Sequence, residues 1–192
     1  MATKTRSPVA DRARLIEIIK SRSYMSGVEI KLASGRISNF YFNLKPTMLD
    51  PEGAHLIGHV VVDALEGIEV DAIGGLEVGA IPIATAAAAI SFSRGRPLPA
   101  FFVRKAAKEH GTKSLIEGLV KGDTLKGKRV VILEDTTTTG GSPLKAAVAV
   151  QAEGASVVRI VTIVDREEGA AEIIRAAGYT YAPILSVRDF RR

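Results

Sequence analysis

The sequence predicts an α/β protein in which helices flank both faces of a central, parallel sheet. After Leu65, apolar strand-like segments alternate with helical segments, as in a chain of βαβ units. Two of the strand-like segments, RVVILED and VVRIVTIVD, are apolar on both faces, which is typical of strands covered by helices on each side. The 192 residues contain no repeat, low-complexity linker or composition break, so we expect a single domain.

The segments before this alternation are less regular. A first helix is expected over residues 11–22, where apolar side chains share one face. Residues 29–44 have irregular or β character and contain LASGRISNFYFNLK, with aromatic residues after a Ser-Gly turn. Asp50 is expected to cap a helix that reaches Leu65 and holds Pro51 in its first turn.

The later segments support the α/β prediction one by one. Strands are expected at VDAIGGL, LPAFFVRK, RVVILED, VVRIVTIVDR and YTYAPILSV, and helices at IPIATAAAAISF, SPLKAAVAVQAEG and GAAEIIRAAG. Open sheets of this kind bind ligands at the carboxyl ends of their strands. The residues that follow each strand are therefore the candidate functional residues.

The composition excludes several classes of protein. With 46% apolar and 24% charged residues, the chain has the profile of a globular protein rather than a disordered, fibrous or membrane protein. The longest apolar stretch, residues 80–92, is too short to span a bilayer, and the N-terminus lacks the apolar part of a secretory signal. The absence of cysteine excludes disulfides, thiolate metal ligands and a thiol nucleophile. We therefore expect a cytoplasmic protein with no membrane partner.

The charge balance favours an anionic ligand. Lys and Arg outnumber Asp and Glu by 26 to 21, which gives a net charge of +5. Much of this excess lies in residues 104–113, and basic residues are not interleaved with aromatic ones. A compact anion, such as a polyphosphate metabolite, is therefore favoured over nucleic acid.

A polar loop follows the strand RVVILED. Glu134 and Asp135 precede four threonines, two glycines and a serine. Glycines let the backbone approach a ligand, and the N–H groups at a helix N-terminus bind phosphate. The two carboxylates would repel that phosphate, so we expect them to face ribose hydroxyls or a cation. The pattern predicts a ribose phosphate site; the alternative, a solvated turn whose acids cap the helix, needs fewer special residues.

Two groups of charged residues follow other strands. A cationic segment after LPAFFVRK contains Arg104, Lys105, Lys108 and His110. Mobile cations can close over a diphosphate leaving group and exclude water, although such a run is also typical of a solvated loop. Arg166 follows the strand that ends at Asp165, and its two-pronged guanidinium suits a carboxylate ligand. A capping pair between these two neighbours is the competing interpretation.

Three weaker patterns have two interpretations each. The segment GGLEVGAIP, with Gly74, Gly75, Gly79 and Pro82, either brings backbone amides to an anion or is a tight strand-to-helix turn. Tyr41 and Phe42 either form a wall of a pocket for a flat ring or belong to the core. His55 and His59 have the spacing of a metal pair, but no third ligand is evident, so we interpret them as surface or packing residues.

Together these motifs resemble those of the type I phosphoribosyltransferases and, among them, the orotate phosphoribosyltransferases. The strand, acid pair and Thr/Gly-rich loop resemble the phosphoribosyl-diphosphate signature of that family. Further motifs occur in the family's order: LASGRISNFYFN at 32–43, GGLEVGAIPIA at 74–84, VRKAAKEHGTK at 103–113 and VDREEGA at 164–170. The resemblance runs from about Leu32 to the C-terminus.

The chain departs from this resemblance at two places. Val78 and Gly79 replace a Tyr-Lys pair present in part of the family, and Ala33 replaces a lysine present in many members. Two cations are therefore missing. We expect the cationic segment to provide more of the positive charge at the diphosphate.

The resemblance implies a fold, a reaction and an assembly. The fold is a central parallel sheet flanked by helices over about residues 50–192, with a helix and a small hood over about residues 1–45. The reaction transfers ribose 5-phosphate from 5-phosphoribosyl 1-diphosphate to N1 of orotate, giving orotidine 5′-phosphate and diphosphate in pyrimidine (UMP) biosynthesis. The expected cofactor is Mg²⁺, bound mainly through the substrate. The expected assembly is a homodimer in which each cationic segment reaches the neighbouring active site.

The same resemblance, with the patterns above, gives the expected site residues. Phosphoribosyl diphosphate is expected at Arg104, Lys105, Lys108, His110, Glu134, Asp135, Thr136, Thr137, Thr138, Thr139, Gly140, Gly141 and Ser142. Orotate is expected at Thr138, Arg166, Tyr41 and Phe42. The expected catalytic residues are Lys108, His110 and Asp135, with either Lys108 or His110 delivering a proton. No side chain is assigned as a direct ligand of the metal.

Two other functions share some of these features. A phosphoribosyltransferase for a purine base would not need an arginine directed at a carboxylate, so Arg166 argues against it. A transcription regulator that senses phosphoribosyl diphosphate would need a DNA-binding module, and about 30 residues before the family match are too few for one. Such a regulator would also tend to lose the cationic segment, which this chain retains.

Overall fold

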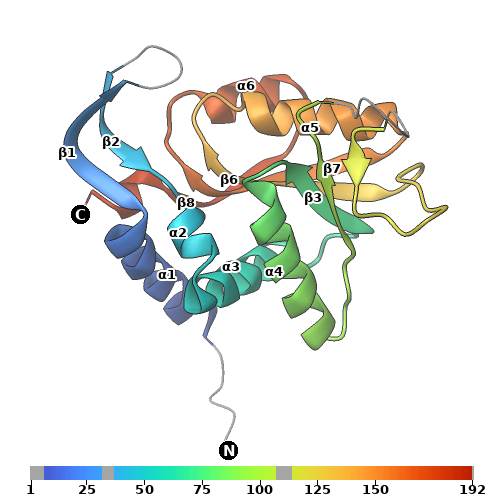
Figure 1. Ribbon diagram of the computed structural model, residues 1–192, viewed down its shortest axis with the longest axis horizontal. Helices are drawn as coiled ribbons and strands as arrows, with labels where there is room; N and C mark the ends of the chain where they lie inside the picture. The colour runs from blue at the N-terminus through green and yellow to red at the C-terminus, as the bar shows by residue number, and fades with distance from the viewer. Residues whose placement is uncertain (1–6, 32–36, 107–113, 192) are drawn as a thin grey trace, which may run out of the picture.

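A computed structural model describes residues 7–31, 37–106 and 114–191 and confirms the α/β prediction (Figure 1). Its centre is a six-stranded sheet with the order β5-β4-β3-β6-β7-β8. Every neighbouring pair is parallel except β4 and β5. The strands are β3 (Ala72–Leu76), β4 (Ala100–Val103), β5 (Ile116–Glu117), β6 (Arg129–Thr137), β7 (Ser156–Asp165) and β8 (Tyr181–Ser186). Lys108 and His110 lie outside the described residues, as does Ala33.

Helices cover both faces of this sheet. On one face lie α1 (Pro8–Arg22), α3 (Pro51–Ala64) and α4 (Ala80–Ser93), and on the other lie α5 (Gly141–Ala152) and α6 (Ala170–Ala176) (Figure 1). Strand β6 contributes to both cores, because successive side chains of a strand point to opposite faces. Val131 and Leu133 belong to the first core, and Val130 and Ile132 belong to the second. This double burial explains why RVVILED is apolar on both faces.

Capping side chains set the start of two helices. The Ser7 hydroxyl accepts a hydrogen bond from the Ala10 N–H at 3.4 Å, so α1 begins at Pro8, three residues before the predicted start. Asp50 Oδ1 accepts from the Gly53 N–H at 2.9 Å and begins α3 as predicted. A short helix, α2 (Lys45–Met48), precedes α3.

The segment predicted as irregular or β is an antiparallel hairpin beside the sheet. Its strands are β1 (Tyr24–Lys31) and β2 (Ile37–Phe42), and Tyr24 lies opposite Phe42. The Phe42 ring packs 4.9 Å from Tyr24 and 5.0 Å from Phe190, measured between ring centroids. Phe190 follows a 3₁₀ turn (Val187–Asp189) after β8, and Figure 1 shows the C-terminus beside β1. The C-terminal segment therefore packs the hairpin against the rest of the molecule.

The longest apolar stretch of the sequence forms α4, which ends at Ser93. Its residues Ile83, Ala84 and Ala87 are buried in the first core, as the sequence predicts for a core helix. In the described parts of the chain, no helix has the length and apolar character needed to cross a membrane.

Candidate active site

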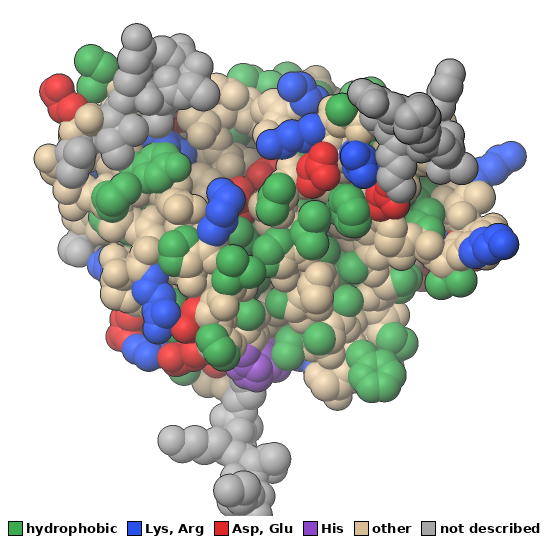
Figure 2. Space-filling model, in the orientation of Figure 1, with side chains coloured by type: hydrophobic (Ala, Val, Ile, Leu, Met, Phe, Trp, Pro, Cys, Tyr) green, Lys and Arg blue, Asp and Glu red, His purple; other side chains and the backbone are tan. Residues whose placement is uncertain are grey.

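The candidate site lies where β3, β6 and β7 end, at one edge of the sheet. These three strands are neighbours in the sheet and run in the same direction, so their carboxyl ends lie together. Each is followed by a helix that begins at this edge: α4, α5 or α6. Figure 2 shows acidic and basic side chains close together near the top of the visible face, between two groups of grey atoms.

A hollow of about 280 Å³ lies at the start of α5 and is lined by residues 136–143 and Lys145. Gly140 has a φ of +80°, which favours glycine, and a Cβ there would lie 3.0 Å from Ile174. Among the described residues, no side chain caps α5, so the N–H groups of its first turn have no capping acceptor beside the hollow. Thr139, Gly141 and Ser142 are exposed there. This geometry suits a phosphate group, as the sequence predicts.

Thr137 differs from the other residues of this loop. Its side chain is only 1% exposed, and its hydroxyl contacts Tyr181 and Asp165 inside the protein. Thr137 therefore lines the hollow without directing its hydroxyl to a ligand. That contact with Tyr181 could not be read from the sequence, because the two residues are 44 positions apart.

The two predicted acids have different environments. Glu134 is 7% exposed, and its Oε2 has no hydrogen-bond partner among the described residues. Burial raises the pKa of the Glu134 carboxyl well above its ordinary value, and the adjacent Asp135 raises it further. Asp135 is half-buried, and its Oδ1 accepts a hydrogen bond from the Thr136 N–H at 2.7 Å. A buried carboxyl oxygen without a partner, beside a second carboxylate, can accept from a ligand hydroxyl or face a cation.

The glycines of GGLEVGAIP have separate roles. Gly74 and Gly75 lie inside β3, where a Cβ would lie 2.3 Å from Phe101 O and 2.1 Å from Leu133 O, respectively. These two positions therefore need glycine because the neighbouring strands pack closely against them. Gly79 precedes α4, and a Cβ there would lie 2.8 Å from Cγ of Asp135. Only this last glycine makes room for a site residue.

The described part of the cationic segment begins beside the turn between β3 and α4. The Lys105 N–H donates to Oε1 of Glu77 at 2.7 Å, and the Arg104 N–H donates to Leu115 O at 2.9 Å. The positive charge of Lys105 acts to lower the pKa of Glu134, which is consistent with a cation close to the acid pair. Arg104 Nη1 lies 3.7 Å from Glu117. The structure thus brings Lys105 to the site, whereas the predicted positions of Lys108 and His110 lie outside the described residues.

Arg166 lies on the other side of the acid pair, after β7, and is 4% exposed. Its Nε and Nη2 contact Glu168 at 2.8 and 2.7 Å, and Nη2 also donates to the Ser38 hydroxyl at 3.2 Å. The guanidinium lies 4.6 Å from the centre of the Phe40 ring. Among the described residues, Nη1 makes no hydrogen bond and remains available to a ligand. Arg166 is therefore held in place by the hairpin and by Glu168, not by a capping contact with Asp165.

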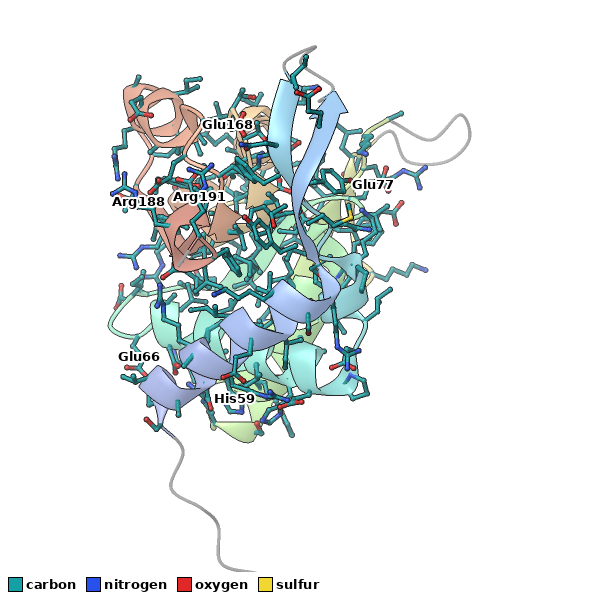
Figure 3. The ribbon with its side chains drawn as sticks, turned by 90° about the vertical axis from the view of Figure 1, so that its left-hand side faces the viewer. His59, Glu66, Glu77, Glu168, Arg188 and Arg191 are labelled. Carbon is teal, nitrogen blue, oxygen red and sulfur yellow. The ribbon has the colours of Figure 1, made fainter. Side chains whose placement is uncertain are left out.

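A hollow of about 520 Å³ adjoins Arg166 and is lined by Ser38, Phe40, Glu168 and Arg191, among others. Figure 3 shows Glu168 and Arg191 on one side of the hairpin and Glu77 on the other. Neither Tyr41 nor Phe42 lines this hollow. Phe42 belongs to the core, and Tyr41 lies on the opposite face of β2, because side chains alternate along a strand.

Sequence reasoning therefore missed Ser38, Phe40 and Arg191. The burial of β2 alternates, so that Ser38 and Phe40 share one face with Phe42. The period of two in ISNFYF was the signal that could have identified Ser38 and Phe40. Arg191 lies 4.7 Å from the Phe40 ring centre, and no pattern in the sequence indicates this contact.

Comparison with known proteins identifies the family. The sequence model of the phosphoribosyl transferase domain matches residues 48–177. Orotate phosphoribosyltransferase from Bradyrhizobium diazoefficiens is 56% identical over 184 residues, which cover 96% of this chain and 98% of the relative. This chain belongs to the orotate phosphoribosyltransferase family. The family relative from Sorangium cellulosum is 44% identical and covers 94% of this chain and 93% of its own length.

Solved structures of orotate phosphoribosyltransferases have the same fold. The Mycobacterium tuberculosis enzyme in complex with Fe(III) dicitrate is 41% identical and superposes with a TM-score of 0.81, covering 95% of this chain and 99% of its own. The same enzyme in complex with 5-phospho-α-D-ribosyl 1-diphosphate has a TM-score of 0.77 at 39% identity and covers 94% and 98% of the two chains. The type I phosphoribosyltransferase fold inferred from the sequence is thus confirmed.

Proposed function

We propose that this enzyme transfers ribose 5-phosphate from 5-phosphoribosyl 1-diphosphate to N1 of orotate, giving orotidine 5′-phosphate and diphosphate in pyrimidine (UMP) biosynthesis. One observation carries the choice of substrates. A phosphate hollow and a buried arginine lie at the ends of neighbouring strands, where the Arg166 N–H donates to Thr137 O at 3.0 Å. A donor sugar phosphate and an acceptor that bears a carboxylate can therefore bind side by side.

The charges of the site suit the bond that must break. As the anomeric bond lengthens, the ribose gains oxocarbenium character and the diphosphate gains negative charge. Glu134 and Asp135 would hold the ribose hydroxyls and place negative charge near the ring. Residues 136–142 would hold the 5′-phosphate, while Arg104, Lys105, Lys108 and His110 would neutralise the diphosphate. Holding the two reactants close together and correctly oriented provides much of the rate enhancement.

The acceptor would bind beside the hairpin. Arg166 would donate Nη1 to the orotate carboxylate, with Thr138 on the donor side of the base. The nitrogen that attacks is already acidic in orotate, so the reaction needs no strong general base. Either Lys108 or His110 would deliver a proton to the leaving diphosphate.

Magnesium is the cofactor that we propose for this reaction. Glu134 Oε2, which has no hydrogen-bond partner in the part of the chain that the structure describes, and the carboxylate of Asp135 are hard oxygen groups. The residues present therefore fit a Mg²⁺ ion held mainly by substrate oxygens. When bound, the ion would neutralise charge on the diphosphate.

We also propose a homodimer that works in the cytoplasm. Exposed hydrophobic side chains at the two ends of α4 support the dimer, since Val78 is 58% exposed and Phe92 is 76% exposed. Figure 2 shows hydrophobic side chains spread over the face formed by α2, α3 and α4.

A substrate panel tests the proposed reaction. Purified protein with magnesium and phosphoribosyl diphosphate is offered orotate, uracil, adenine or hypoxanthine in separate assays. We expect consumption of orotate alone, with release of diphosphate. Consumption of another base in preference to orotate would contradict the assignment of Arg166 to a carboxylate.

A further inference from the structure

Three buried polar side chains connect the two halves of the proposed site. The Tyr181 and Thr137 hydroxyl oxygens lie 2.5 Å apart, and the Thr137 hydroxyl lies 3.4 Å from Oδ1 of Asp165. The three side chains come from β8, β6 and β7, and none is more than 6% exposed. Buried polar groups of this kind are costly to leave unpaired, so a connected set of them fixes its members in one arrangement.

The direction of these hydrogen bonds follows from the groups involved. Burial raises the pKa of the Tyr181 hydroxyl well above its ordinary value, so Tyr181 keeps its proton. The carboxylate of Asp165 can only accept, and the Thr137 hydroxyl has a single proton to donate to it. Thr137 therefore accepts from Tyr181 and donates to Asp165. Tyr181 is the first donor of this chain.

Two members of this chain of hydrogen bonds, Thr137 and Asp165, adjoin parts of the site. Thr137 is the last residue of β6 and precedes Thr138 in the phosphate loop. Asp165 is the last residue of β7 and precedes Arg166. Oδ1 of Asp165 also accepts from the Glu167 N–H at 2.8 Å, and Glu167 has a φ of +57°, which non-glycine residues rarely adopt. Asp165 thus stabilises the turn that directs the Arg166 side chain.

Tyr181 itself has no contact with the ligand sites. It lines neither the hollow at the start of α5 nor the hollow beside Arg166, and its ring belongs to the core under α5 and α6. The hydrogen bond of its hydroxyl therefore reaches the site through Thr137 and Asp165.

We propose that Tyr181 is a positioning residue for this reaction, because its hydroxyl, through Thr137 and Asp165, fixes the phosphate loop relative to Arg166. The role rests on the proposed function, since only a transfer between two ligands requires these two parts to be in register. Loss of the hydroxyl would let the donor and acceptor sites shift against each other.

The test compares two changes that each remove one phenolic hydroxyl. Tyr181→Phe removes the first donor of the chain and keeps the ring in the core. Tyr179→Phe is the matched control, because the Tyr179 hydroxyl donates to Gln151 Oε1 at 2.6 Å, outside this network. For each variant, kcat with orotate is measured well below its melting temperature. Hydrogen exchange is measured in the free protein at the amides of Arg166, Glu167 and Ser156.

We expect Tyr181→Phe to lower kcat about tenfold or more, since small misplacements of reacting groups have large effects on rate. Exchange at the Arg166 and Glu167 amides should accelerate about tenfold, whereas the Ser156 amide, at the start of β7, should be unaffected. Tyr179→Phe should change neither quantity. Adding Thr137→Val to Tyr181→Phe should lower kcat no further than Thr137→Val alone, because both changes break one chain of hydrogen bonds.

Several results would overturn this role. They are a kcat for Tyr181→Phe within twofold of the wild type, unchanged exchange at Arg166 and Glu167, equal acceleration at Ser156, or independent effects of the two substitutions. A wild-type enzyme that does not consume orotate would instead refute the proposed function. The wild-type assay therefore separates that failure from a failure at Tyr181.

Discussion

Glu134 and Asp135 are neighbours in the sequence but occupy different environments. Glu134 is inside the protein, and one of its oxygens has no hydrogen-bond partner within residues 7–31, 37–106 and 114–191, whereas Asp135 is half-buried against Gly79. The acid pair and the Thr/Gly loop could be predicted from the sequence, because all their functional groups belong to consecutive residues. Which acid is buried was not predictable, since burial depends on packing between strands and helices.

Glu134→Gln is expected to raise the free energy of unfolding at neutral pH, in the absence of ligands. Burial raises the folded-state pKa of Glu134 above 4.5, so the unfolded chain loses its proton first as pH rises. The wild-type carboxyl thus destabilises the folded state above pH 4.5, and the advantage of glutamine should grow until the folded-state pKa is passed. Urea unfolding over a pH series checks this.

Glu66→Gln is the control for that series, because Glu66 is exposed. We expect it to change the stability little at any pH. An advantage of Glu134→Gln that stays constant with pH would contradict the buried environment of Glu134.

Gly79→Ala is expected to lower kcat/KM for phosphoribosyl diphosphate about tenfold, because displaced site groups reduce rates strongly. The new Cβ would lie 2.8 Å from Cγ of Asp135, so this carboxylate must move. The φ of −61° at Gly79 suits alanine, so the free energy of unfolding should change little. Steady-state kinetics and urea unfolding together check the prediction, and an unchanged kcat/KM would show that Asp135 tolerates the shift.

At the scale of elements, the alternation of strands and helices was predictable because each has its own hydrophobic period. The hairpin was only partly predictable. Its aromatic face packs on Phe190, far away in the sequence, and this contact decides that Phe42 is a core residue. The same register places Phe40 beside Arg166. Tyr41 and Phe42 were predicted to form a wall of the orotate pocket because they are aromatic. That prediction did not take into account which face of β2 each side chain occupies.

Phe190→Ala is expected to lower the free energy of unfolding by about 3 kcal/mol, as is typical of Phe-to-Ala changes in a core. Phe190 is 4% exposed and packs on both Tyr24 and Phe42. The hairpin should loosen first, so KM for orotate should rise more than KM for phosphoribosyl diphosphate. Val9→Ala serves as the control, because Val9 is 80% exposed and packs on neither Tyr24 nor Phe42. Equal changes in the two KM values would argue against a link between Phe190 and the base site.

At the scale of the whole molecule, the sheet gathers the acid pair, the phosphate loop and Arg166 at one edge. The sequence could predict which residues lie at this edge, because the carboxyl ends of parallel strands lie together. The positions of Lys108 and His110 remain a prediction from the sequence. The homodimer also remains a prediction, because hydrophobic residues of an interface between chains cannot be told from hydrophobic core residues in the sequence.

Mixing two inactive variants tests the shared site. Lys108→Ala and Asp135→Asn are each expected to lower kcat strongly, because one removes a cation from the diphosphate and the other an acid from the ribose. When the two are co-expressed, about a quarter of wild-type activity should return, since half of the dimers are mixed and each has one intact site. Diphosphate release measures the recovery.

The control mixture pairs Asp135→Asn with Arg166→Ala. Both of these residues belong to the part of the site that one chain provides, so no mixed dimer contains an intact site. Recovery in neither mixture would mean that each chain uses its own cationic segment.

Helix α5 begins without a capping side chain, in contrast to α1 and α3. Ribose 5-phosphate should bind there and raise the melting temperature of the free protein, with about 2.7 kcal/mol of stabilisation at 100 times its Kd. Ribose without the phosphate is the control and should give a much smaller shift. Calorimetry at increasing ligand concentration checks this, and equal shifts with the two sugars would exclude the start of α5 as the phosphate site.

Substrate binding at the start of α5 would also link the lifetime of the protein to the supply of that substrate. A proteolytic enzyme that attacks opened chains acts on the population that is unfolded at a given moment, and bound substrate reduces that population. The enzyme should therefore persist longer in a cell with abundant phosphoribosyl diphosphate and be degraded faster when the donor is scarce. Binding of the substrate phosphate at the start of α5 would in this way adjust the amount of enzyme to the supply of phosphoribosyl diphosphate, and this would need no separate regulatory site.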